Sequence, residues 1–173
     1  MALGTKHYNN YAMQTNNSNK SLLIAMGTGA NNMVIGYLCE RLADRVDFAF
    51  IDSLDQREWD KELPDAKLQA LKQKKSSAIL LVMLGGNTGS GCVETIISLF
   101  QKHQLTFSAV VVLPFEYEGS RPKALPLAGK LKEAAVAYRH FDSQTLLAMQ
   151  DLTMREAMQH ADKEIEKLLM EIL

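Results

Sequence analysis

The residue types best suited to binding chemistry gather in one short segment of the chain. It reads Gly85, Gly86, Asn87, Thr88, Gly89, Ser90 and Gly91. An apolar run, residues 78–84, precedes it, and residues 92–100 have the pattern of a helix. Glycine allows positive φ angles and close approach of a ligand, and the free amides at a helix start attract anions. The segment predicts a phosphate-binding turn between a strand and a helix, although such turns also occur without a ligand. No Lys follows the last glycine, so the order is not that of a P-loop.

A second turn of the same kind follows the apolar run of residues 22–26. It contains Gly27, Thr28, Gly29 and Asn32, and an amphipathic helix is predicted for residues 33–43. The order of strand, turn and helix predicts another anion site. A tight turn with no ligand explains the same residues equally well, because Gly-x-Gly alone is a weak signal.

Asp52 ends the second predicted strand, residues 48–52. An acid at this place can bind the ribose hydroxyls of a dinucleotide, so Gly27, Gly29 and Asp52 are compatible with an NAD-binding enzyme. Against this alternative, Asn32 stands where the third glycine of that fingerprint would be. Capping of a helix or turn by the carboxylate is the simpler explanation.

The segment 85–91 resembles the GGGTGTG or GGGTGSG signature of the tubulin/FtsZ family, with Asn87 in place of one glycine. The turn after residue 26 is similar to the first glycine-rich loop of FtsZ, in which the final Asn matches Asn32. Thr28, Ala30 and Asn31 depart from that loop. The resemblance implies a guanine nucleotide, GTP or GDP, with Mg²⁺ as a possible companion, and it implies that both turns hold the phosphates.

Two further segments carry the resemblance to FtsZ. Residues 114–119 read Pro-Phe-Glu-Tyr-Glu-Gly, which is similar to the family's Pro-Phe-x-Phe-Glu-Gly and implies that Glu118 contacts the ribose. A basic residue of the family's site falls on Pro122 here, and the adjacent Arg121 is the candidate substitute.

The last helix would carry the residues that contact the base. The family's stacking Phe and guanine-reading Asn fall on Met158 and Asp162, and another guanine-contacting Asn falls on Met149. Met149 cannot make that contact. A carboxylate can accept hydrogen bonds from guanine's ring N–H and exocyclic amine, so Asp162 is compatible with guanine. A surface position opposite the apolar stripe of the helix is the alternative for Asp162.

Apolar runs that alternate with helices indicate an α/β fold: a three-layer, doubly wound, mostly parallel sheet of the Rossmann-like kind, similar to the FtsZ/tubulin GTPase domain. Residues 21–173 are expected to form one domain, and residues 1–20 a disordered tail. The fifth strand, taken from the resemblance, is expected at residues 145–149, after a helix at 128–139. Thr153 and Glu156 form a capping box before a helix that runs to the end of the chain. The turns after residues 26, 51, 84 and 113 would meet at the carboxyl edge of the sheet.

The composition excludes several classes of function. The chain has 173 residues with a net charge of -1, which gives no support for binding to nucleic acid or a membrane surface. Two cysteines and the lack of a long apolar run or signal pattern make a cytoplasmic protein the expectation. No pair of His residues has the spacing of a transition-metal site. Cys92 falls in the first turn of a helix, where a thiolate is favoured, but an inert core thiol is the simpler expectation.

The resemblance to FtsZ implies a nucleotide-binding domain that lacks the family's second domain and catalytic acidic loop. It would act as a binding or regulatory module in cell division, with at most a weak GTPase completed by a partner, either a further copy or an FtsZ-like protein. Two alternatives remain: an NAD-dependent enzyme, and a degenerate scaffold that binds no nucleotide. In the scaffold, the last helix would form an oligomer face that includes Ile165.

Overall fold

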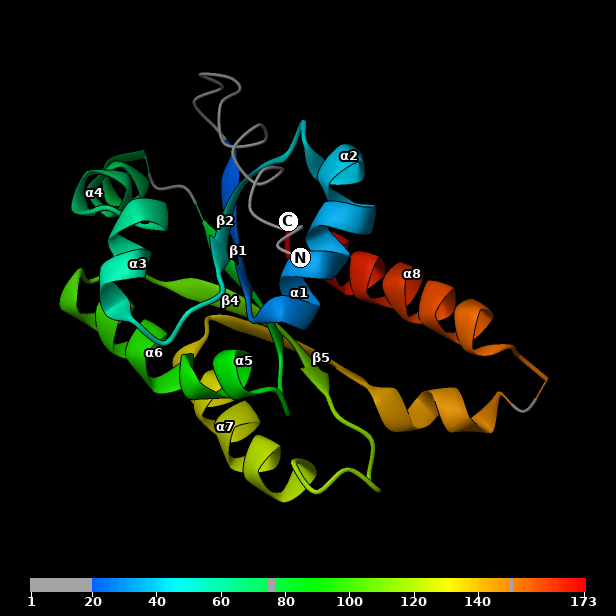
Figure 1. Ribbon diagram of the computed structural model, residues 1–173. Coiled ribbons are helices and arrows are strands. Elements are labelled where there is room, and N and C mark those ends of the chain that lie inside the picture. Colours follow the sequence, from blue (N-terminus) through cyan, green and yellow to red (C-terminus); the bar gives the residue numbers. More distant parts are fainter. Residues whose placement is uncertain (1–19, 75–76, 150) are drawn as a thin grey trace, which may run out of the picture.

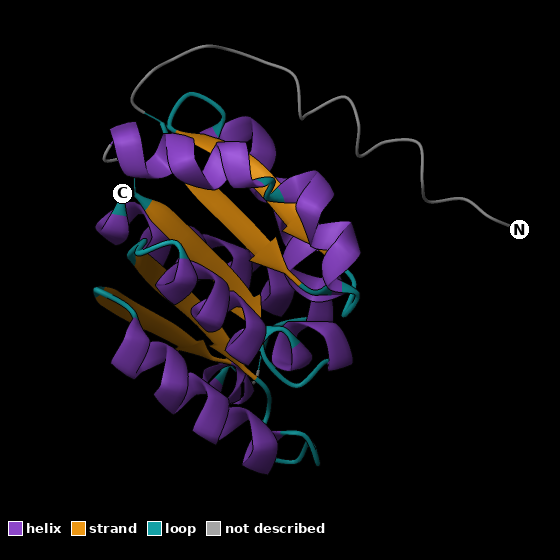
Figure 2. Ribbon diagram, turned by 90° about the vertical axis from the view of Figure 1, so that its left-hand side faces the viewer, coloured by secondary structure: helices purple, strands orange, loops and turns teal. Residues whose placement is uncertain are grey.

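Five parallel strands form the centre of the protein in a computed structural model that describes residues 20–74, 77–149 and 151–173. The predicted disordered tail, residues 1–20, lies outside the described residues except for Lys20. The strands are β1 (Ser21–Met26), β2 (Val46–Ile51), β3 (Ala78–Met83), β4 (Phe107–Leu113) and β5 (Ala137–Asp142). Their order in the sheet is β2-β1-β3-β4-β5. Figure 2 shows them side by side with helices on both faces.

The apolar character of the central strands follows from their position. β4 is buried along its whole length and β3 at all residues except Met83, because helices cover both faces of a parallel sheet. β1 and β3 are neighbours in register, with Met26 opposite Val82. The turns that follow these two strands therefore leave the sheet side by side.

Two groups of helices cover the sheet (Figure 1). One face carries a continuous helical run and the last helix: α1 (Thr28–Met33), the π-helix η2 (Val34–Leu38), α2 (Cys39–Leu42) and α8 (Met154–Ile172). The other face carries α3 (Gln56–Glu62), α4 (Asp65–Lys74), α6 (Val93–Lys102) and α7 (Arg121–Ala134). Two short segments complete the fold, α5 (Asn87–Gly91) and the 3-10 helix η3 (Ser143–Ala148). The predicted three-layer α/β architecture is confirmed.

The fifth strand is not where the sequence predicts it. Residues 145–149 were expected to be a strand, but residues 143–148 form η3, and the strand is β5. The expected helix at 128–139 ends at Ala134. β5 is an edge strand with exposed Arg139 and His140, so it lacks the apolar run that marks the inner strands.

The helices after the two glycine turns begin earlier than expected. The first was predicted from residue 33 but begins at Thr28, directly after Gly27. The second was predicted from residue 92, but Asn87–Gly91 is already helical. The predicted turns are therefore shorter, and most of their residues lie in first helical turns.

α8 begins as predicted and packs on the sheet. The Thr153 hydroxyl accepts from the Glu156 amide, and the Glu156 carboxylate accepts from the Thr153 amide, which confirms the capping box. Ile165 is only 2% exposed within the core. The proposed oligomer face through Ile165 is therefore wrong, because this side chain is used inside the domain.

Candidate functional site

The two glycine turns contact each other at the carboxyl edge of the sheet. Gly27 has a φ of 88°, and a Cβ placed on it would lie 2.8 Å from the backbone nitrogen of Gly89. A Cβ on Gly89 would lie 2.5 Å from the Met83 carbonyl oxygen and 3.2 Å from that of Met26. The ends of β1 and β3 and the starts of α1 and α5 thus meet at one point, as the sequence predicted for these two turns.

Several amides in these turns have no hydrogen-bond acceptor within the described part of the chain. They belong to Thr28 and Gly29 at the start of α1, and to Asn87 and Thr88 at the start of α5. First-turn amides of a helix point out of its start, where the helix dipole is positive. The arrangement offers donors from two helices to a single anion.

The hydroxyl side chains of the turns are partly used within the protein. The Ser90 hydroxyl accepts a hydrogen bond from the Gly85 amide at 2.9 Å, which closes the turn on itself. The Thr28 hydroxyl donates to Asp52 Oδ1 at 3.0 Å. Asp52 therefore joins the turn after β2 to the start of α1 through a side-chain contact, and no backbone amide of the described residues donates to it as helix capping would require.

The glycines of the second turn have different surroundings. A Cβ on Gly85, which has a φ of 107°, would lie 2.9 Å from the Ser120 hydroxyl, and a Cβ on Gly91 would lie 2.6 Å from a Leu54 methyl group. Gly85 is required by its positive φ, whereas the exposed Leu54 side chain could move away from a Cβ at Gly91. Gly86 is exposed, and a Cβ there would meet no atom within 4 Å, so its side of the turn is open to a ligand.

Glu118 lies half-buried in the loop after β4. Its carboxylate accepts from the Phe115 amide at 3.2 Å and from the Ser120 hydroxyl at 3.4 Å. Ser120 is also the side chain beside Gly85, so the Glu118 loop adjoins the glycine turn.

Arg121 is committed to contacts within the chain. Its guanidinium donates to both carboxylate oxygens of Asp142, at 2.8 and 2.7 Å, and to the Pro114 carbonyl. The guanidinium holds the pKa of Asp142 below its usual value, with a smaller contribution from the Gln144 amide. Arg121 thereby fastens the loop after β4 to the end of β5.

The candidate base-contacting residues lie on α8, opposite α1. Met158 is 61% exposed and Asp162 is half-buried. Partial burial raises the pKa of Asp162, and no described residue donates a hydrogen bond to its carboxylate. The Asp162 carboxylate is therefore suited to accept hydrogen bonds from N–H groups of a bound base.

The two asparagines of α1 have different environments. Asn32, chosen from the family resemblance, is exposed. Its neighbour Asn31 is 1% exposed, and neither polar atom of its side chain has a partner among the described residues. Nothing in the sequence separates the two, because both are equally polar and adjacent.

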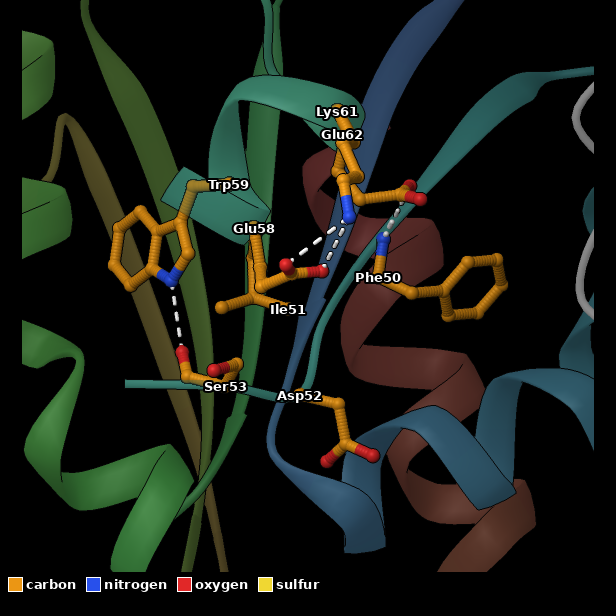
Figure 3. Close-up of a pocket in the computed structure, with 8 residues that line it drawn as sticks. All are labelled: Phe50, Ile51, Asp52, Ser53, Glu58, Trp59, Lys61 and Glu62. Atoms are coloured by element: carbon orange, nitrogen blue, oxygen red, sulfur yellow. Dashed lines mark hydrogen bonds and ion pairs between the residues drawn. The ribbon is translucent and has the colours of Figure 1, made fainter. Parts of the chain in front are cut away.

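A cavity of about 270 Å³ lies beyond the edge strand β2, beside Asp52 (Figure 3). Within it Lys61 pairs with Glu58, and Glu62 accepts from the Phe50 amide at 3.2 Å. Trp59 donates to the Ser53 carbonyl. In Figure 3 the Asp52 carboxylate points away from these contacts and toward α1. Asp52 thus belongs to the turn more than to the cavity.

The described residues offer neither a reactive cysteine nor a metal-binding cluster. Cys92 is 1% exposed, and burial raises the pKa of its thiol to about 11, so it is a core thiol. Among residues 20–74, 77–149 and 151–173, no group of three His, Cys, Asp or Glu side chains could hold a metal ion. None of the described helices is both long and apolar enough to span a membrane.

This chain is similar to known proteins in sequence and in fold. No protein-family model matches the chain. The cell division protein FtsZ of Aquifex aeolicus strain VF5 is 31% identical over 105 residues, which cover 58% of this chain and 29% of that protein. This chain therefore spans under a third of its curated relative.

Solved structures share the fold. An FtsZ W319Y mutant from M. jannaschii superposes with a TM-score of 0.63 at 18% identity, covering 88% of this chain and 55% of that one. A GTPγS-form TubZ protofilament of Bacillus thuringiensis serovar israelensis gives 0.61 at 14% identity, covering 90% and 56%. An empty FtsZ dimer from M. jannaschii gives 0.57 at 18% identity, covering 85% and 52%.

The chain therefore has the fold of the FtsZ and TubZ structures, and its two glycine turns touch at the carboxyl edge of that fold's sheet. By sequence the chain is similar to an FtsZ over 105 residues, in agreement with the predicted resemblance to that family. It spans about half the length of the solved relatives.

Proposed function

We propose that this domain binds a guanine nucleotide, with its phosphates at the junction of the two glycine turns. The observation that carries the proposal is the contact between Gly27 and Gly89, which brings two helix starts with free amides to one point. The open side at Gly86 leaves room for the phosphates there.

The rest of the nucleotide follows from the surrounding elements. Glu118, in the loop that touches the glycine turn, is assigned to the ribose, and Arg121 acts by holding that loop against Asp142. The base is assigned to the space between the helical run that begins with α1 and the residues Met158 and Asp162 on α8. Asp162 would accept from the ring N–H and the amine of guanine, which favours guanine over adenine.

We propose a binding or regulatory role in the cytoplasm, connected with cell division, in which hydrolysis is at most weak and depends on a partner. Phosphoryl transfer requires an oriented water and charge stabilisation beyond phosphate binding. Relatives named as a dimer and as a protofilament support self-association as the form in which such a partner would be supplied.

Isothermal titration with GTP, GDP, ATP and NAD, each with and without Mg²⁺, tests the proposal. GTP and GDP are expected to release heat and to bind at least about tenfold more tightly than ATP, because one to two hydrogen bonds to a charged acceptor distinguish the bases. Asp162→Ala, which removes the acceptor, should remove most of this preference while the chain stays folded. No heat with either guanine nucleotide refutes the proposal.

The same titration separates the dinucleotide alternative. NAD binding that is weakened by Asp52→Ala and unchanged by Glu118→Gln would favour a dinucleotide enzyme. The reverse pattern with GDP, a loss on Glu118→Gln, is the expected result.

A further inference from the structure

A side-chain cluster outside the predicted site joins the two helices that flank the proposed base position. The Tyr37 hydroxyl, on η2, donates to Glu166 Oε2 on α8 at 2.6 Å. Arg41, one turn further on α2, lies 3.6 Å from Glu166 Oε1, and its guanidinium stacks 4.5 Å above the Tyr37 ring. These three side chains connect segments that are far apart in the sequence.

The π-helix explains why Tyr37 reaches α8. A π turn holds more residues than an α turn, so it rotates the following side chains backward around the helix axis. Leu38 and Leu42 are buried in line with Val34, at 0% and 1% exposure. Tyr37 lies beside this stripe, half-buried, and its hydroxyl reaches Glu166. π turns of this kind occur frequently at functional sites.

The charges around Tyr37 fix the direction of its hydrogen bond. The pKa of Tyr37 is raised, first by the hydrogen bond to Glu166 and also by the nearby Asp162. The hydroxyl therefore keeps its proton and acts as donor to Glu166. Arg41 compensates the charge of Glu166, so Asp162 is the acid near this cluster whose carboxylate has no donor among the described residues.

We propose that Tyr37 is a positioning residue that sets the base selectivity of the nucleotide site. Glu166 lies one helical turn after Asp162 on α8, and Tyr37 follows Asn32 on the continuous run of α1 and η2. The Tyr37–Glu166 hydrogen bond thus fixes the spacing and rotation of the two walls between which the base would lie. A hydrogen bond between Asp162 and guanine requires that spacing, because misplacement by about 1 Å weakens such contacts strongly. The inference rests on the proposed nucleotide function.

The test compares GDP with inosine diphosphate, which lacks the 2-amino group, and with pyrophosphate, which has no base. Tyr37→Phe removes one hydroxyl and keeps the ring that contacts Arg41. It is expected to lower the ratio of GDP to inosine diphosphate affinity by about fivefold, the size of a typical coupling between neighbouring residues. Affinity for pyrophosphate should stay within about twofold, because the glycine turns are not altered.

Two controls separate positioning from general loosening. Tyr138→Phe removes the same atom from a ring of β5 that packs in the core on the other face of the sheet from α1 and α8, and it should leave all three affinities unchanged. Glu166→Gln keeps an oxygen that accepts from Tyr37 and should retain more of the GDP preference than Glu166→Ala.

The outcomes distinguish the two proposals. If the unaltered protein binds no GDP, the nucleotide function is refuted and the role of Tyr37 falls with it. If the unaltered protein prefers GDP and Tyr37→Phe keeps the same ratio, the positioning role alone is refuted. An equal loss of GDP and pyrophosphate affinity in Tyr37→Phe also refutes it, because that result indicates a structural effect.

Discussion

Replacement of Gly89 by alanine tests the contact between the two glycine turns directly. The new methyl group would lie 2.5 Å from the Met83 carbonyl oxygen, against about 3.4 Å for ordinary van der Waals contact, so a shift of about 0.9 Å is needed. The Met26 carbonyl, at 3.2 Å, blocks a second direction. Both obstacles are backbone atoms at strand ends, which cannot rotate away as a side chain can.

The expected loss of stability follows from these distances. Overpacking of this kind costs about 1–3 kcal/mol, and the higher helix propensity of alanine offsets up to about 1 kcal/mol. We expect a net destabilisation of about 2 kcal/mol, which lowers the Tm by about 4–8 °C for a domain of this size. Displacement of the α5 amides should also weaken GDP binding.

Gly86→Ala is the matched control, because it makes the same change three residues earlier. A Cβ on Gly86 meets no atom within 4 Å, and its φ of -79° is open to alanine. Its stability should stay within about 0.5 kcal/mol of the unaltered protein, since the effects of capping and chain entropy are small and opposed. GDP affinity should nevertheless fall, because the methyl group occupies the proposed phosphate space.

Urea unfolding of both variants, with GDP titration beside it, measures the two effects separately. A Gly89→Ala protein as stable as the unaltered one would show that the turns do not touch as described. A Gly86→Ala protein with full GDP affinity would show that phosphate does not approach that side of the turn.

Three further predictions concern the elements around the site. Arg121→Met should lower stability at neutral pH by roughly 2 kcal/mol, because it leaves Asp142 without its cation. The pKa of Asp142 is lowered in the folded state, so this contribution is complete above the ordinary pKa of an aspartate and declines as the pH falls from about 4 through the lowered pKa; urea unfolding at pH 7 and pH 3 should show the gap between the two proteins narrow. Cys92 should resist iodoacetamide at pH 8 until urea unfolds the chain, since its thiol pKa is about 11; labelling of the folded protein, followed by peptide mass spectrometry, would contradict this. Ile165→Glu should destabilise the domain by about 3 kcal/mol or more because it buries a charge, whereas Met158→Glu on the exposed part of α8 should change thermal unfolding little; equal behaviour of the two variants would contradict the burial described.

The features predicted well from the sequence are those encoded locally. Residues 78–84 and 85–91 stand next to each other in the chain, and the apolar run followed by glycines was sufficient to place a buried strand and a turn. The Thr153–Glu156 capping box is equally local. Edge strand β5 was missed because its exposed side chains carry no apolar pattern.

Features that depend on contacts between distant residues could not be read from the chain. Tyr37 and Glu166 are 129 positions apart, and no local pattern connects them. Arg121 was predicted to replace a basic residue that contacts the nucleotide. Its orientation is instead set by Asp142, which lies 21 positions later at the end of β5, the strand whose position was predicted wrongly. An ordinary amphipathic helix was predicted over residues 33–43, and the π turn at Val34–Leu38 was not anticipated.

The first turn differs from the FtsZ pattern at Thr28, Ala30 and Asn31, and the side chains of these residues make contacts within the domain. Thr28 stands where the family has glycine, but its hydroxyl is bonded to Asp52 at the end of β2. Ala30 and Asn31 are buried at 0% and 1% exposure, so their side chains occupy the interior and not the space before the helix start. The glycine that must remain is Gly27, whose positive φ and contact with Gly89 exclude any side chain. Gly27 therefore serves the close packing of the two turns, whereas the residues that replace glycine at positions 28, 30 and 31 direct their side chains to Asp52 or into the interior.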